Sequence, residues 1–144
     1  MIIPHIDDVT RSTIEEESVK ENVPLELLYN PVTKFISENG IPAEVVIGEL
    51  ITNSGFFGKG RTTKPCIVIV HNDKSSRKSN NYYSFGIITE FEYGLTHIKL
   101  FAYGESTLAK LRSYDPEKNL YAREWESESR YYGAVKRAFN SIFD

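Results

Sequence analysis

The sequence has little of what marks secreted, membrane-spanning or disordered proteins. It contains a single cysteine, Cys66, so no disulfide can form within the chain, which is typical of a reducing compartment. No apolar run approaches the roughly 20 residues that a membrane-spanning helix needs, and the first residues lack the basic segment and apolar core of a secretory signal. Of the 144 residues, 40% are hydrophobic and 26% are charged, which are ordinary values for a globular protein. We therefore expect one domain over residues 1–144, located in the cytoplasm.

The charges are spread unevenly along the chain, although the net charge is only -3. Residues 1–50 contain ten acidic and three basic residues, a balance of -7, whereas residues 51–100 contain seven basic and three acidic residues, a balance of +4. This distribution is compatible with charge pairing inside the fold or with two surfaces for two partners. An acidic chain is not typical of proteins that coat DNA.

Helices are predicted on both sides of the break at Asn22-Val23-Pro24. Ser12 and Glu15 have the spacing of a capping box, so residues 7–21 are predicted to form a surface helix with a thin apolar stripe. Apolar residues recur every three or four positions over residues 24–39, which predicts a second helix, or a kinked pair because Pro31 interrupts it. The Asn39-Gly40 pair is a typical end for a helix.

The hydrophobic pattern changes to that of strands after Gly40. Segments 43–52, 66–70, 82–93 and 96–103 are rich in β-branched and aromatic residues, and several of them alternate apolar with polar positions. The connections are too short for crossover helices, so the four strands are predicted to form an antiparallel meander. A short helix at residues 107–112 and a long amphipathic helix at residues 121–143 follow, and the long helix is expected to cover the sheet. The predicted fold class is α+β: N-terminal helices, a four-stranded antiparallel meander sheet and a C-terminal amphipathic helix packed on the sheet.

Aromatic residues are concentrated on the later strands and the last helix. About half of them are expected to be buried between the last helix and the sheet face that it covers. The others either lie under the N-terminal helices on the second sheet face, or form an exposed surface for a partner or a second copy of the chain. The residues concerned are Tyr82, Phe101, Tyr103 and Tyr131.

The most conspicuous local segment is SGFFGKGRTTK at residues 54–64. It is not a phosphate-binding loop, because Gly58-Lys59 is followed by glycine and the segment leads into a strand. Three interpretations remain for it: a structural hairpin, a protein-binding loop with Phe56 and Phe57 as anchors, or a weak nucleic-acid contact. The basic residues of the last two interpretations are Lys59, Arg61 and Lys64. A second basic loop, expected at the opposite end of the meander, contains Lys74, Arg77 and Lys78.

The sequence contains few residue spacings that are typical of metal sites or catalytic groups. A zinc site that combines His5, His71 and Asp73 lacks any pair of ligands at His-x-x-x-His or Cys-x-x-Cys spacing. Cys66 opens the most apolar strand, which is typical of a buried and inert thiol. His97 is expected to face solvent or to pair with a cross-strand glutamate such as Glu90 or Glu92. We predict no metal, cofactor or catalytic residue.

A metal-dependent hydrolase or nuclease is the enzyme that the strand carboxylates most resemble in outline. The carboxylates are Glu44, Glu49, Asp73 and Glu90. The lysine that polarises the attacking water is missing, because Glu90-Phe91-Glu92 has an acid where that lysine would stand. The sequence therefore favours binding without catalysis, as an adaptor that contacts a protein partner or a second copy of itself. The alternatives are a weak nucleic-acid-binding accessory protein that uses the two basic loops and, less favoured, the hydrolase.

Overall fold

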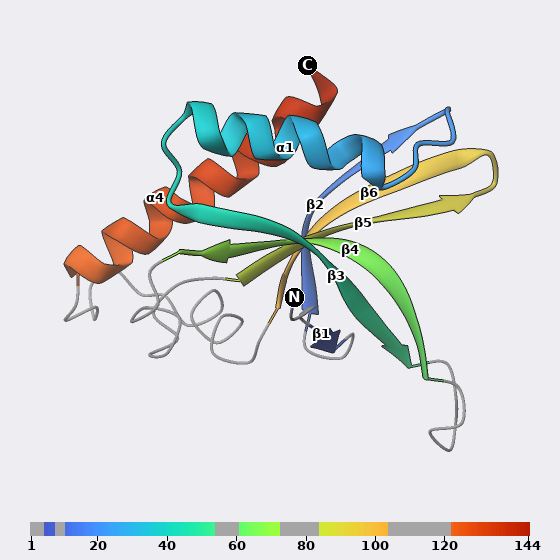
Figure 1. The fold of residues 1–144 in the computed structure, drawn as a ribbon, viewed down its shortest axis with the longest axis horizontal. Coiled ribbons are helices and arrows are strands. Elements are labelled where there is room, and N and C mark those ends of the chain that lie inside the picture. Colours follow the sequence, from blue (N-terminus) through green and yellow to red (C-terminus); the bar gives the residue numbers. More distant parts are fainter. Residues whose placement is uncertain (1–4, 8–10, 54–60, 73–83, 104–121) are drawn as a thin grey trace.

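The computed structural model describes residues 5–7, 11–53, 61–72, 84–103 and 122–144, and at the ends of several elements only the backbone. A six-stranded sheet carries both long helices on one of its faces (Figure 1). The α+β class predicted from the sequence is confirmed. The elements are β1 (His5–Asp7), β2 (Arg11–Val19), α1 (Glu26–Glu38), β3 (Ala43–Asn53), β4 (Arg61–His71), β5 (Ser84–Glu92), β6 (Leu95–Tyr103), α4 (Ala122–Asn140) and the short 3-10 turn η2 (Ser141–Phe143).

The predicted four-stranded meander is present as β3, β4, β5 and β6, each antiparallel to the next. Two further strands extend it, so the order across the sheet is β1-β3-β4-β5-β6-β2. The long strand β2 is antiparallel to β6, and the three-residue β1 is parallel to the second half of β3.

The helix predicted over residues 7–21 is wrong, because residues 11–19 form the edge strand β2. Strand β2 pairs with β6 along its whole length, and a bulge between Thr13 and Glu15 shifts its register. After the bulge, Glu16 lies opposite Lys99 and Ser18 opposite His97, while Val19 packs against the core. Long-range pairing with β6 thus overrides the local capping-box spacing. The few apolar residues that indicated a surface helix are equally compatible with an edge strand.

The second predicted helix is confirmed as one element, α1, with Pro31 inside it. Pro31 is exposed and removes one helical hydrogen bond on the solvent side, whereas Leu28, Val32 and Ile36 are buried on the other side. The helix therefore keeps its packing face despite the proline.

The core consists of two clusters, one on each face of the sheet. On the first face α1 and α4 pack on β4, β5 and β6, which confirms that the C-terminal helix covers the sheet. The second cluster comprises Leu50, Cys66, Val68, Ile88 and Phe101. Of the two alternatives for this second face, cover by the N-terminal helices is not found among the described residues, since α1 shares the face of α4 and residues 11–19 form a strand.

The predicted aromatic surface is also corrected in part. Phe101 and Tyr131 are buried rather than exposed, and the exposed aromatic side chains among the described residues are Phe91 and Tyr93. The side chain of Tyr103, residue Tyr82 and the helix predicted at 107–112 lie outside what the structure describes.

Candidate functional site

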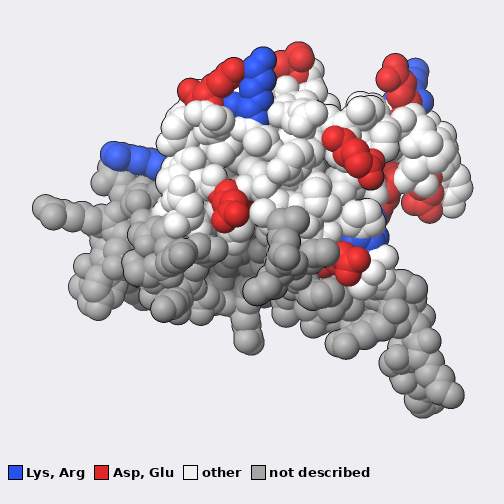
Figure 2. All heavy atoms as spheres, in the orientation of Figure 1, with Lys and Arg blue, Asp and Glu red and all other residues white. Residues whose placement is uncertain are grey.

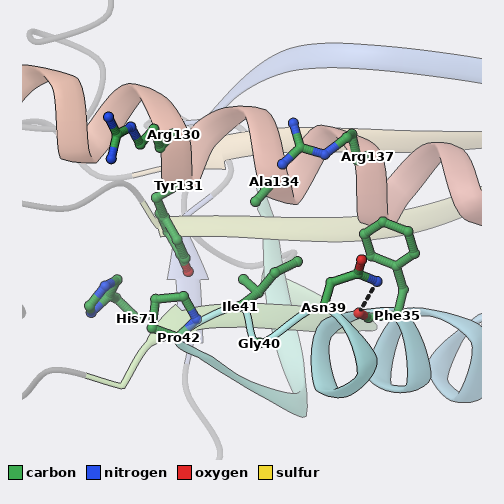
Figure 3. Close-up of a pocket in the computed structure, with 10 residues that line it drawn as sticks. All are labelled: Phe35, Asn39, Gly40, Ile41, Pro42, His71, Arg130, Tyr131, Ala134 and Arg137. Carbon is green, nitrogen blue, oxygen red and sulfur yellow. Dashed lines mark hydrogen bonds between the residues drawn. The ribbon is translucent and has the colours of Figure 1, made fainter.

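A groove lies where α4 passes the C-terminal end of α1 (Figure 3). It has a volume of about 340 Å³, at the lower end of the range for ligand pockets. Its walls come from the last turn of α1, the segment that joins α1 to β3, the end of β4 and the middle of α4. The lining residues are Phe35, Asn39, Gly40, Ile41, Pro42, His71, Arg130, Tyr131, Ala134 and Arg137.

The groove wall formed by Asn39, Gly40 and Ile41 is held in place by the hydrogen bonds that end α1. Gly40 has a φ of 61°, a left-handed conformation that glycine adopts without strain, and the Ile41 amide donates to the Ile36 carbonyl at 3.1 Å. The Asn39 side-chain amide donates to the Phe35 carbonyl at 2.8 Å (Figure 3). These bonds satisfy carbonyls at the end of the helix and turn the chain sharply into β3.

A backbone bond ties the same segment to the neighbouring strand. The Asn72 amide donates to the Pro42 carbonyl at 3.0 Å, so the joint between α1 and β3 is held against the end of β4. Ile41 and Pro42 therefore form an apolar wall whose position is set by the backbone rather than by loose packing.

One end of the groove is closed by two rings. The rings of His71 and Tyr131 meet edge to face with centroids 4.9 Å apart, and Tyr131 also lies 6.0 Å from Phe85. Both His71 and Tyr131 are buried, and Figure 3 shows Tyr131 reaching from α4 toward the joint between α1 and β3. This contact fixes how closely α4 approaches the sheet.

The charge of the groove is positive. Arg130 and Arg137 are exposed, and their spacing of seven residues places them about 10 Å apart along one side of α4. None of the ten lining residues is acidic. Within the described part of the chain, no ion pair or hydrogen bond engages the guanidinium of Arg137. The groove thus offers cationic donors beside apolar walls.

The binding residues predicted from the sequence lie elsewhere. Phe56, Phe57 and Lys59 fall outside the described residues, as do Lys74, Arg77 and Lys78 of the second basic loop, so their roles stay predictions. Arg61 begins β4, but the structure describes only its backbone.

Lys64 has neighbours of its own on the adjacent strand. Its ammonium donates to the Thr89 carbonyl at 3.1 Å and lies 3.5 Å from the Glu90 carboxylate. Glu90 also accepts a hydrogen bond from Lys99 at 3.1 Å. Partial burial raises the pKa of Glu90, but the Lys99 hydrogen bond and the charges of both lysines outweigh it and leave the pKa below its ordinary value. These contacts make Glu90 a structural carboxylate held between two lysines.

His97 lies beside a glutamate of a neighbouring strand, as predicted, but that residue is Glu16 and not Glu90 or Glu92. Its ring nitrogen Nδ1 lies 2.8 Å from the Ser18 hydroxyl and 3.6 Å from the Glu16 carboxylate, both on β2, rather than against Glu90 or Glu92. The difference arises because residues 11–19 form a strand beside β6. Glu15 on the same strand pairs with Lys136 of α4 at 3.1 Å, so part of the acidic N-terminal charge is matched inside the fold.

Cys66 is fully buried, as the sequence predicted. Burial raises the pKa of its thiol to about 11, so the thiol stays protonated at neutral pH and is a poor nucleophile. Within the described ranges, no three histidine, cysteine or acidic side chains gather as metal ligands do. Glu44 is exposed on β3 and Glu49 lies further along it, so neither joins Glu90 in a described cluster.

Sequence reasoning missed the groove, although it identified both helices that form it. The available signal was the pair Arg130 and Arg137 on the same side of an amphipathic helix as Ala134. What the sequence does not show is that the end of α1 faces this part of α4.

No family model, no curated protein and no solved structure matches the chain. Neither α1 nor α4, the long helices of the described residues, has the length and apolar character needed to cross a membrane.

Proposed function

We propose that this chain is a non-catalytic binding domain of the cytoplasm, and that its α1–α4 groove takes an acidic, partly apolar segment of a protein. The observation that carries the proposal is the presence of two exposed arginines beside an apolar wall, in a groove without acidic lining.

The arginines determine the charge of the ligand. A guanidinium binds a carboxylate through two parallel hydrogen bonds, and such charge-assisted bonds are about twice as strong as neutral ones. Arg130 and Arg137 are spaced for two carboxylates on one extended or turning segment. Ile41, Pro42 and Phe35 supply the apolar surface that an intervening side chain would cover.

The size and charge of the site favour a peptide over a nucleic acid. Two arginines provide few phosphate contacts, and the affinity for nucleic acid depends on several such contacts at once. The nucleic-acid alternative relies on the two basic loops, most of which lie outside the described residues, and nothing described favours it.

Peptide titrations followed by fluorescence anisotropy test this function. The probe is a labelled peptide of alternating glutamate and phenylalanine, and its control has glutamine in place of glutamate. We expect the glutamine peptide to bind at least tenfold more weakly, since charged hydrogen bonds contribute about 1.5–3 kcal/mol each. Arg137→Glu should weaken binding of the acidic peptide by at least the same factor.

The matched control is Lys34→Glu, which makes the same change of charge on the exposed side of α1, outside the groove lining. Its affinity for the acidic peptide should stay within about twofold of the original. The proposal is wrong if both peptides bind alike, if neither binds, or if Arg137→Glu is no weaker than Lys34→Glu.

A further inference from the structure

The hairpin between β5 and β6 has an unusual turn. Glu92 ends β5 opposite Leu95, which begins β6, so Tyr93 and Gly94 alone form the turn. Both have positive φ, 54° and 76°, as a type I′ turn requires. Glycine and asparagine suit these positions, whereas a bulky residue such as tyrosine is strained there. Tyr93 therefore stands at a position for which its side chain is unfavourable.

The side chains at this tip project into solvent. Tyr93 is 93% exposed and Phe91 is 55% exposed, and the acidic Glu92 between them is exposed as well. The described part of the chain gives these aromatic rings no core to pack against. Local folding does not account for an aromatic residue at this turn, whereas contact with another molecule does.

Two hydrogen bonds at Thr96 tie the base of the hairpin to a neighbouring segment. The Thr96 hydroxyl is buried, accepts a hydrogen bond from the Val23 amide at 3.1 Å and donates one to the Glu21 carbonyl. These bonds join the hairpin to the segment between β2 and α1. A preorganised tip loses little conformational entropy on binding.

The tip and the groove are complementary in chemistry. The tip offers the exposed carboxylate of Glu92 and the exposed ring of Tyr93, and the groove offers two guanidinium groups beside an apolar wall. Acidic and basic side chains both lie over the end of the molecule that carries the hairpin (Figure 2), so the complementarity rests on the tip itself. Tip and groove lie at opposite ends of the fold, so a chain cannot place its own hairpin in its own groove (Figure 1).

We propose that the groove of one copy of this chain binds the β5–β6 hairpin tip of a second copy, so that copies associate head to tail. The inference rests on the proposed function and names the partner of that same groove. Each copy has one tip and one groove, so association is heterologous and continues into open chains or closes into a ring. Glu92 pairs with Arg137, and Tyr93 covers the apolar wall.

Sedimentation velocity over a range of concentrations tests this arrangement with two variants that each block one side. Tyr93→Asn removes the aromatic tip but suits the turn, and Arg137→Glu alters the groove but keeps the tip. We expect the original chain to grow in mass with concentration, less so at high salt, and each variant to stay monomeric. An equimolar mixture of the two variants should stop at a 1:1 dimer, because only one productive interface can form.

The controls are Leu27→Gln, which removes another exposed apolar side chain, and Lys34→Glu, which makes the same charge change as the groove variant. Both should associate like the original chain. Circular dichroism checks the fold of every variant, and Arg137→Gln replaces Arg137→Glu if the latter unfolds.

Three results would overturn the inference: a monomeric original chain at several hundred micromolar, oligomers that neither variant weakens, or a variant mixture that stays monomeric. If the chain is monomeric while Arg137→Glu still loses the acidic peptide, the proposed function stands and only the identity of the partner is wrong. If the peptide result also fails, the groove is not a binding site for acidic segments.

Discussion

The ring of Phe101 on β6 lies across the Cα atom of Gly86, its partner in register on β5. A Cβ atom added to Gly86 would lie 2.9 Å from Cε1 of the ring and closer still to Cζ. The glycine therefore leaves room for a ring that packs flat against the neighbouring strand. Phe101 is fully buried in this position, beside Val68 and Ile88 in the second core cluster.

Replacing Gly86 by alanine should destabilise the protein, because the Phe101 ring must leave its position. We expect the free energy of unfolding in urea to fall by about 1–3 kcal/mol, as for other overpacked cores. Gly133→Ala is the matched control in α4, where the new Cβ would lie 3.5 Å from the flexible Arg137 side chain. It should gain roughly 0.5–1 kcal/mol of stability from helix propensity. A Gly86→Ala protein as stable as the original would contradict the described packing.

The turn residue Tyr93 should be unfavourable for stability. A left-handed conformation costs an L-residue roughly 1–2 kcal/mol, and asparagine followed by glycine is the preferred pair for this turn. We expect Tyr93→Asn to raise the free energy of unfolding by about 0.5–1 kcal/mol while it abolishes association. A loss of stability in thermal or urea unfolding would mean that the Tyr93 ring supports its own domain.

Glu90 should make stability depend on pH. Its pKa is lowered in the folded protein, so the stabilisation is present above the ordinary titration range of glutamate and is lost as the pH falls through that range and below it. The stability difference between the original chain and Glu90→Gln should therefore be largest at neutral pH and shrink on acidification. Urea unfolding from neutral pH to about pH 3 measures this difference. A difference that stays constant with pH would show that the lysine contacts are not formed.

The parts of the fold that follow from local pattern were predictable. The alternation of apolar residues in β5 and β6 and the helical spacing in α1 and α4 each depend on a continuous segment. Strand β2 was not predictable in this way, because its charged residues are explained only by His97, Lys99 and Lys136 on elements about 80 or more residues later. Its bulge also breaks the alternation that identifies strands.

The candidate site was harder to predict than the fold. Asn39-Gly40 indicated the end of a helix, and the amphipathic pattern placed Tyr131 and Ala134 on the last helix. The two segments line one groove only because the sheet brings the joint after α1 beside the end of β4 and under α4. The glycine-rich segment at residues 54–64 is conspicuous because its composition is unusual, whereas each groove residue is ordinary by itself.

Chemical-shift mapping on the isotope-labelled protein shows whether the proposed acidic segments bind in the α1–α4 groove. The alternating glutamate–phenylalanine peptide is added stepwise, and the backbone amides and the arginine side-chain signals are followed. We expect Arg137→Glu to remove the shifts, which should gather at Asn39, Gly40, Ile41, Ala134 and the Arg137 guanidinium. Shifts that gather on another surface, or no shifts at all, would contradict this expectation.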